Sequence, residues 1–149
     1  MDEINELEPC QIDFYLLGDA SMDASRFAGR LAMMAWERKQ KIFILTETEE
    51  QSGVLDDVLW HYPEQRFLPH GLAKDTGSSK APVTIGTASE LEEIDVVINM
   101  ALAPVSKPDR FKRILEIVPF SENERGASRD KYKVYRANGI TPGTHEINK

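Results

Sequence analysis

The sequence predicts a three-layer α/β fold in which a mostly parallel sheet is flanked by helices. Two observations support this prediction. Short, continuous apolar runs recur along the chain, as in buried parallel strands, and the segments between several of them carry apolar residues at helical spacing. Because strands alternate with helices, we expect parallel strands joined by right-handed crossovers.

The first half of the chain supplies a strand, helix, strand and helix in turn. The apolar run 12–17 predicts a buried strand, and Ser21 or Asp23 can cap the helix that follows. A second buried strand is expected at 41–46. Residues 49–62 then favour another helix, because their apolar positions recur with helical spacing.

The second half is expected to begin with a brief extended segment, 67–70, and a polar loop, 71–82. Three more apolar runs then indicate strands at 82–85, 95–99 and 114–118. A C-terminal helix is predicted for 121–138, and Gly139 is suited to end it.

A chain of 149 residues fits one domain, which we expect at 12–139. We interpret 1–11 as a disordered acidic extension and 140–149 as a tail with no obvious structure. The extension lacks the cations of a secretory signal or mitochondrial presequence, and no apolar run approaches the roughly 20 residues of a membrane span. These features predict a cytoplasmic protein. Cys10 is the only cysteine, which excludes an internal disulfide.

Charge is unevenly distributed along the chain. The net charge of −7 opposes nonspecific binding to a phosphate backbone, so we expect no direct DNA binding. Residues 1–60 hold 13 acids against 5 bases, whereas residues 110–136 hold 8 bases against 4 acids. A local basic surface is therefore expected near the C-terminus.

The densest basic cluster lies at 129–139. If this region is helical, four cations and one aromatic ring lie on the same face, at spacings i, i+4, i+7, i+8 and i+11. These residues are Arg125, Arg129, Tyr132, Lys133 and Arg136. Such a face suits an anion carried on an apolar group. A solvated flank whose cations favour the helix terminus is the other interpretation.

Catalytic and cofactor motifs are absent from the sequence. The turn 18–21 follows the first strand, where nucleotide-binding folds carry a phosphate loop, but it has neither the glycine pattern nor the lysine of such loops. An ordinary turn is favoured, and a nucleotide-binding protein or enzyme using this turn is the alternative. The histidines lack metal-ligand spacing, and there is no nucleophile elbow. We therefore expect no catalytic residues, metal or cofactor.

Two large aromatic residues, Trp60 and Phe67, flank Pro63. Aromatic side chains at such a junction either fill the core or anchor a partner. Spacing alone leaves both interpretations open.

Taken in order, these blocks resemble the chi subunit family of bacterial DNA polymerase III, from Phe14 to about Gly139. The matching blocks are Phe14-Tyr15-Leu16-Leu17, Leu55-Asp56-x-x-Leu59-Trp60, Pro63, Phe67-x-Pro69-His70-x-Leu72, Ala81-Pro82-Val83 and Arg129-x-x-Tyr132-Lys133-x-Tyr135-Arg136. The resemblance implies a Rossmann-like fold without a nucleotide site, and a non-catalytic adaptor of the clamp loader.

The resemblance also implies two binding surfaces. One would hold the acidic, phenylalanine-ending C-terminal tail of single-stranded DNA-binding protein, through Arg125, Arg129, Tyr132 and Lys133, with Val118 near an apolar pocket. The cations would pair with carboxylates while the apolar groups cover the terminal ring. The other surface, around Trp60 and Phe67, would contact the psi subunit of the clamp loader or a helicase partner. No membrane association is expected.

Overall fold

The computed structural model describes residues 10–62, 67–75 and 81–148 of the chain. Its strands are β1 (Gln11–Leu17), β2 (Ile42–Leu45), β3 (His70–Leu72), β4 (Val83–Gly86), β5 (Val96–Asn99), β6 (Arg113–Val118) and β7 (Gly143–Ile147). Its helices are α2 (Ala24–Glu37), α3 (Glu49–His61) and α4 (Glu122–Ala137), with short 3₁₀ turns at Ala88–Glu90 and Pro108–Arg110. None of these helices is long and apolar enough to cross a membrane.

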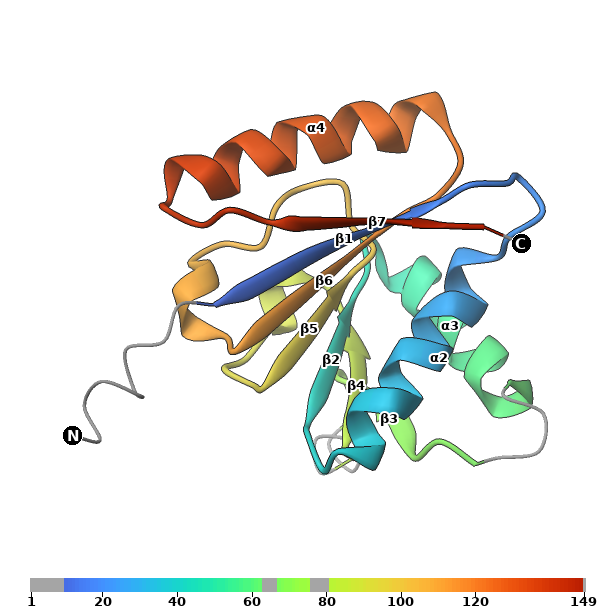
Figure 1. Cartoon of the computed structure of the whole chain (residues 1–149). Helices are drawn as coiled ribbons and strands as arrows, with labels where there is room; N and C mark the ends of the chain where they lie inside the picture. Colours follow the sequence, from blue (N-terminus) through green and yellow to red (C-terminus); the bar gives the residue numbers. More distant parts are fainter. Residues whose placement is uncertain (1–9, 63–66, 76–80, 149) are drawn as a thin grey trace.

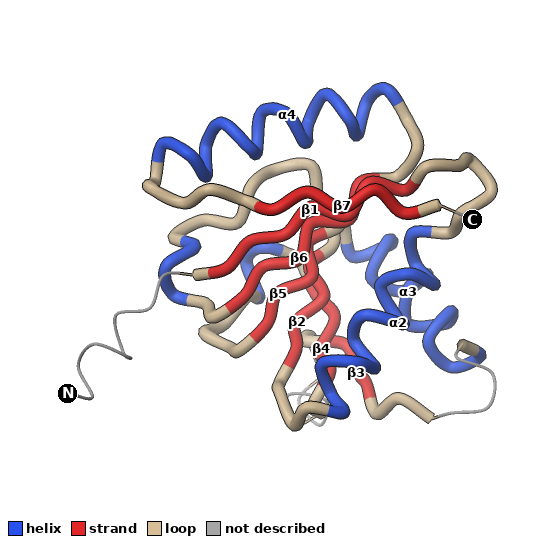
Figure 2. Tube along the Cα trace, in the orientation of Figure 1, coloured by secondary structure: helices blue, strands red, loops and turns tan. Residues whose placement is uncertain are grey.

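The seven strands form one sheet in the order β3-β4-β2-β5-β6-β1-β7, and every neighbouring pair is parallel. Helix α4 lies along one face, whereas α2 and α3 lie on the other (Figure 1). The tube in Figure 2 shows the strands fanning out with a twist between these layers. The predicted three-layer α/β fold is confirmed, and the sheet is wholly parallel rather than mostly so.

The helix boundaries follow local capping. Before α2, the Asp23 carboxylate accepts a hydrogen bond from the backbone N–H of Ser25 at 2.8 Å, so Asp23 is the N-cap. After α4, Gly139 has a φ of +85°, and the N–H of Ile140 donates to the Tyr135 carbonyl at 3.1 Å. A left-handed residue at this point ends the helix, as predicted for Gly139.

The sheet separates two apolar clusters. In β2, Ile42 and Ile44 pack with α2 and α3, whereas Phe43 and Leu45 join the cluster below α4. Helix α2 buries mainly apolar residues, namely Phe27, Ala28, Gly29, Leu31, Ala32, Met33 and Ala35. Helix α4 buries only Ser128, Lys131 and Tyr135. The two sides of the sheet are therefore held together by different chemistry.

The prediction of an unstructured tail was wrong for 143–147, which form β7 and pair with β1. This strand is short, polar and mostly exposed, so it lacks the apolar pattern of a buried strand. It is joined to β1 through Asp13, which is 5% exposed: Asp13 Oδ1 lies 2.9 Å from His145 Nε2, and Arg113 Nη2 donates to Asp13 Oδ2 at 3.2 Å. Tertiary partners, not local pattern, define β7.

Two further boundaries differ from the sequence prediction. Gly71 and Leu72, expected in a polar loop, belong to β3, whereas 76–80 lie outside the described residues. Of the predicted disordered extension, 1–9 lie outside the described residues, but Gln11 already begins β1. The preceding thiol of Cys10 is buried, and this burial, with a smaller effect of Asp109, raises its pKa to about 11.

Candidate protein-binding surfaces

Helix α4 carries the predicted cationic residues along its outer side. Arg129, Lys133 and Arg136 are exposed, whereas Arg125 and Tyr132 are half-buried. Residues three and four positions apart lie on the same side of a helix, so this set forms a continuous strip. We call the strip formed by Arg125, Arg129, Tyr132 and Lys133 the α4 face.

Arg125 forms the N-terminal end of the α4 face. Its guanidinium lies over the ring of Phe120, 4.8 Å from the centroid, and Nη2 donates to the Leu17 carbonyl at 3.4 Å. Its Nε is buried and has no hydrogen-bond partner among the described residues. Arg125 also lines a pocket of about 210 Å³ with Gly18 and Glu146. A guanidinium that lines a pocket next to a half-exposed ring suits a carboxylate attached to an apolar group.

Val118 belongs to the apolar cluster below α4, and Tyr132 packs against this cluster as a partly buried residue. The Tyr132 ring lies 5.9 Å from the Phe14 ring, at an interplanar angle of 49°. Tyr132 is partly exposed, so its outer edge is available to a ligand. Val118 is only 2% exposed and supports the surface from beneath rather than forming it.

A buried polar network lies between α4 and the sheet. Lys131 Nζ donates to Glu116 Oε1 at 2.8 Å and to the Ala101 carbonyl at 2.5 Å. The other oxygen, Glu116 Oε2, accepts from the Tyr135 hydroxyl at 2.5 Å and from Asn99 Nδ2 at 2.9 Å. Burial and the Glu116 carboxylate raise the pKa of Tyr135, which keeps its hydroxyl protonated as a donor.

This network holds α4 in one orientation. Burying a charge is costly unless it is paired and hydrogen-bonded, and here Glu116 and Lys131 satisfy each other at 0% and 4% exposure. With Lys131 turned toward the sheet, Arg129 and Lys133 remain exposed. Sequence reasoning missed the pair because it treated 114–118 as an apolar run. The carboxylate in the middle of that run was the available signal.

Trp60 and Phe67 form an exposed aromatic pair that we call the aromatic patch. Their side chains are 58% and 62% exposed, and the ring centroids lie 6.0 Å apart. Of the two interpretations that spacing left open, this exposure favours an anchor for a partner over a place in the core.

The aromatic patch is supported from behind by His70, whose side chain is fully buried. The His70 ring lies 4.8 Å from the Trp60 ring, at 60°. His70 Nδ1 is 2.7 Å from the Leu68 carbonyl, and Nε2 is 3.3 Å from Asp56 Oδ1. The Asp56 side chain faces this histidine and is only 23% exposed.

The turn 18–21 has a role in packing. Gly18 N–H donates to the Ile147 carbonyl at 2.9 Å, and a Cβ on Gly18 would lie 2.8 Å from that oxygen. Glycine is therefore needed for the approach of β7. The first N–H groups of α2, which could otherwise bind a phosphate, already donate hydrogen bonds to the Asp23 carboxylate. This geometry gives the nucleotide-binding alternative no support.

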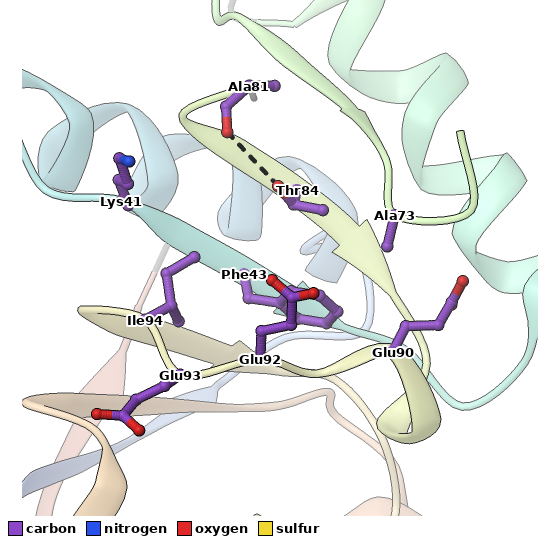
Figure 3. A pocket seen from close by; sticks show the side chains of 9 residues that line it. All are labelled: Lys41, Phe43, Ala73, Ala81, Thr84, Glu90, Glu92, Glu93 and Ile94. Carbon is purple, nitrogen blue, oxygen red and sulfur yellow. Dashed lines mark hydrogen bonds between the residues drawn. The ribbon is translucent and has the colours of Figure 1, made fainter. Parts of the chain in front are cut away.

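A separate pocket of about 190 Å³ opens beside β2 and β4 (Figure 3). Phe43 and Ile94 supply apolar surface, and the charged lining residues are Lys41, Glu90, Glu92 and Glu93. The Thr84 hydroxyl donates to the Ala81 carbonyl at 3.5 Å. Three carboxylates against one lysine make this pocket unfavourable for a phosphate. Within the described ranges, no group of three or more His, Cys, Asp or Glu side chains could hold a metal ion.

Sequence comparison identifies close similarity to one family. The family model for the DNA polymerase III chi subunit, HolC, matches residues 10–143. The chain is 31% identical over 139 residues to the DNA polymerase III subunit chi of Pseudomonas aeruginosa, covering 92% of this chain and 96% of that protein. It is 28% identical over 138 residues to the Escherichia coli subunit chi, covering 88% and 94% of the two chains.

Structural comparison adds information on the fold alone. A chain in a complex of S. cerevisiae Dbp5 with Nup159, Gle1, IP6 and ADP aligns with a TM-score of 0.66 at 11% identity, over 94% of this chain and 42% of that one. The C-terminal domain of the DEAD-box protein Dbp5 aligns with a TM-score of 0.58 at 14% identity, over 92% and 91% of the chains.

Proposed function

Because the chain belongs to the DNA polymerase III chi subunit family, whose members are accessory and non-catalytic, we propose that it is an adaptor of the replication machinery. In this proposal, the α4 face binds the acidic C-terminal tail of single-stranded DNA-binding protein, and the aromatic patch binds the psi subunit or a helicase. The protein thereby links single-stranded DNA-binding protein to the clamp loader. A role of this protein in DNA replication agrees with the cytoplasmic location that the sequence predicts.

The observation that carries the proposal for the tail is the chemistry around Arg125. Its guanidinium lines a pocket and lies over the half-exposed Phe120 ring, so a cation and an apolar surface are offered at one point. Arg129 and Lys133 extend positive charge along the helix for the acidic residues that precede a terminal phenylalanine. The protein's net charge of −7 would meanwhile oppose binding to DNA itself.

The aromatic patch supports a second, independent partner. Trp60 lies on α3, on the side of the sheet opposite to α4, and Phe67 precedes the edge strand β3, so neither segment contributes to the α4 face. Large exposed aromatic side chains are common energetic centres of protein interfaces. A psi subunit or helicase bound there leaves the α4 face free for the acidic tail.

The tail site is tested by titration calorimetry with a short acidic peptide ending in phenylalanine. We expect micromolar affinity for the wild type. Arg129→Ala should weaken binding by about 1 to 3 kcal/mol if the guanidinium meets a partly desolvated carboxylate. Lys133→Ala should also weaken peptide binding.

Arg136→Ala is the matched control for this titration, because Arg136 is also exposed on α4 but lies outside the proposed contact set. We expect its affinity to stay within about twofold of the wild type. Unchanged affinity in both Arg129→Ala and Lys133→Ala would remove the assignment of the α4 face. A peptide with an amidated C-terminus tests the terminal carboxylate separately.

A further inference from the structure

We propose that His70 is a positioning residue that fixes the geometry of the aromatic patch, and that Asp56 holds His70 in place. The inference rests on the proposed function in one respect, because it takes the aromatic patch to be the partner site. Asp56 and His70 both belong to the sequence blocks that match the chi subunit family, and neither lies on the exposed surface itself.

His70 connects the two segments that form the patch. Its ring contacts the Trp60 ring near the end of α3, and its Nδ1 lies against the carbonyl of Leu68, the residue after Phe67. Leu68 is fully buried, so this contact reaches a fixed point of the backbone. A single imidazole therefore relates the position of Trp60 to that of Phe67.

Asp56 gives this imidazole a defined orientation. It lies four residues before Trp60 on α3, so the carboxylate and the indole leave the same side of the helix. One ring nitrogen of His70 faces the Leu68 carbonyl and the other faces the carboxylate, at 2.7 and 3.3 Å. A ring flip would put carbon in place of Nδ1 against the Leu68 carbonyl, so that oxygen selects the rotamer that places Nε2 beside the Asp56 carboxylate.

The contact between Nε2 and Asp56 is close but poorly aligned, and Nε2 has no hydrogen-bond partner among the described residues. A buried polar atom with only this neighbour is costly if its purpose is stability alone. An apolar ring of similar size would fill the same space behind Trp60 without that cost. We explain the polar ring instead by its fixed orientation, which sets the positions of Trp60 and Phe67 in the aromatic patch.

Trp60 itself provides a test that needs no partner. The Trp36→Phe background leaves Trp60 as the single tryptophan of the chain. In this background, His70→Leu should broaden the fluorescence lifetimes of Trp60 and increase acrylamide quenching by roughly twofold, because the indole gains rotamers. His70→Asn keeps an N–H donor near the position of Nδ1 and should restore much of the wild-type signal.

Partner binding provides the second readout, with purified psi subunit as the probe in titration calorimetry. His70→Leu and Asp56→Asn should each weaken psi binding, the former by about tenfold or more and the latter by less. Asp57→Asn is the matched control, because Asp57 is the adjacent, exposed carboxylate on α3. The affinity of every variant for the acidic peptide should stay within about twofold, which separates positioning from general unfolding.

These outcomes separate the inference from the proposed function. If Trp60→Ala abolishes psi binding while His70→Leu changes neither psi affinity nor Trp60 fluorescence, the positioning role is wrong and the partner site stands. If psi binds the wild type and Trp60→Ala equally, the partner site is wrong. Altered Trp60 fluorescence in His70→Leu, recovered in His70→Asn, would then still support the positioning role.

Discussion

The α4 face and the aromatic patch differ in what lies behind them. Behind the α4 face, a charged pair with 0% and 4% exposure anchors a helix whose other buried residues are Ser128 and Tyr135. Behind the aromatic patch, one buried imidazole supports two large apolar rings. Each surface is nevertheless held in its orientation by a buried polar group, the Glu116–Lys131 pair in one case and His70 in the other.

This difference indicates how each surface should respond to change. A cationic strip attracts its ligand through charge, so salt and charge substitutions should affect it most. An aromatic pair binds through desolvated area, so loss of a ring should affect it most. The four predictions below test this contrast, beginning with the largest expected effect.

Lys131→Met should destabilise the protein by about 3 to 5 kcal/mol, because it leaves the Glu116 carboxylate buried without its charge partner. Urea unfolding measures this change. The double variant Lys131→Met with Glu116→Gln should recover much of the loss. If the single variant costs under about 1 kcal/mol, the network does not anchor α4 in the way proposed.

Phe67→Ala should weaken psi binding by about 2 to 4 kcal/mol and leave stability nearly unchanged, because Phe67 is 62% exposed. Calorimetry with psi measures the affinity, and urea unfolding of the same preparation measures the stability. Val54→Ala, which truncates another exposed apolar residue on α3, is the control. Unfolding of Phe67→Ala would instead support a core role for this residue.

Asp13→Asn should destabilise the protein by about 1 to 3 kcal/mol at pH 7, because it disrupts the contacts of Asp13 with His145 and Arg113. Burial raises the pKa of Asp13, but these hydrogen bonds outweigh it and lower the folded-state pKa. The stabilisation is therefore present above the unfolded pKa of about 4 and is lost as the pH falls through the folded value.

Urea unfolding at several pH values tests this linkage, since wild type and Asp13→Asn should converge in acid. Peptide affinity should change modestly in the variant, because Glu146 on β7 lines the pocket beside Arg125. Psi affinity should not change. An equal loss at both surfaces would mean that the variant weakens the whole fold rather than the β1 and β7 edge.

Salt should give the smallest effect and the clearest contrast. Raising ionic strength from about 0.05 M to 0.5 M should weaken acidic-peptide binding by roughly tenfold, because it screens exposed charges. Psi binding at the aromatic patch should change by no more than about twofold. Equal salt dependence of the two affinities would contradict the proposed division between charge and apolar area.

The main elements could be predicted because their signals are local. Asp23 caps α2 and Gly139 ends α4 through side-chain and backbone chemistry that is visible in short stretches of sequence. Strand β7 could not be predicted, because its polar residues gain a partner only from β1 at the other end of the chain. Its edge position requires little apolar surface, so periodicity carries no information there.

The candidate sites show the same division. Exposed cations and aromatic residues on α4 and α3 follow from helical spacing and from the family resemblance. The groups behind them do not, because whether Lys131 or His70 is buried depends on the fold rather than on neighbours in sequence. For Trp60, sequence spacing is the same for a core residue and for an anchor that binds a partner. Only its exposure in the structure distinguishes the two.

The position of β1 between β6 and β7 has a consequence for synthesis of the chain. Strand β1 is synthesised well before its partners β6 and β7, and Asp13 meets Arg113 and His145 across 100 and 132 positions of sequence. Such distant pairings raise the contact order and slow folding. Until β6 and β7 are synthesised, the apolar side chains of β1 have no strand beside them, and exposed apolar surface of this kind favours aggregation.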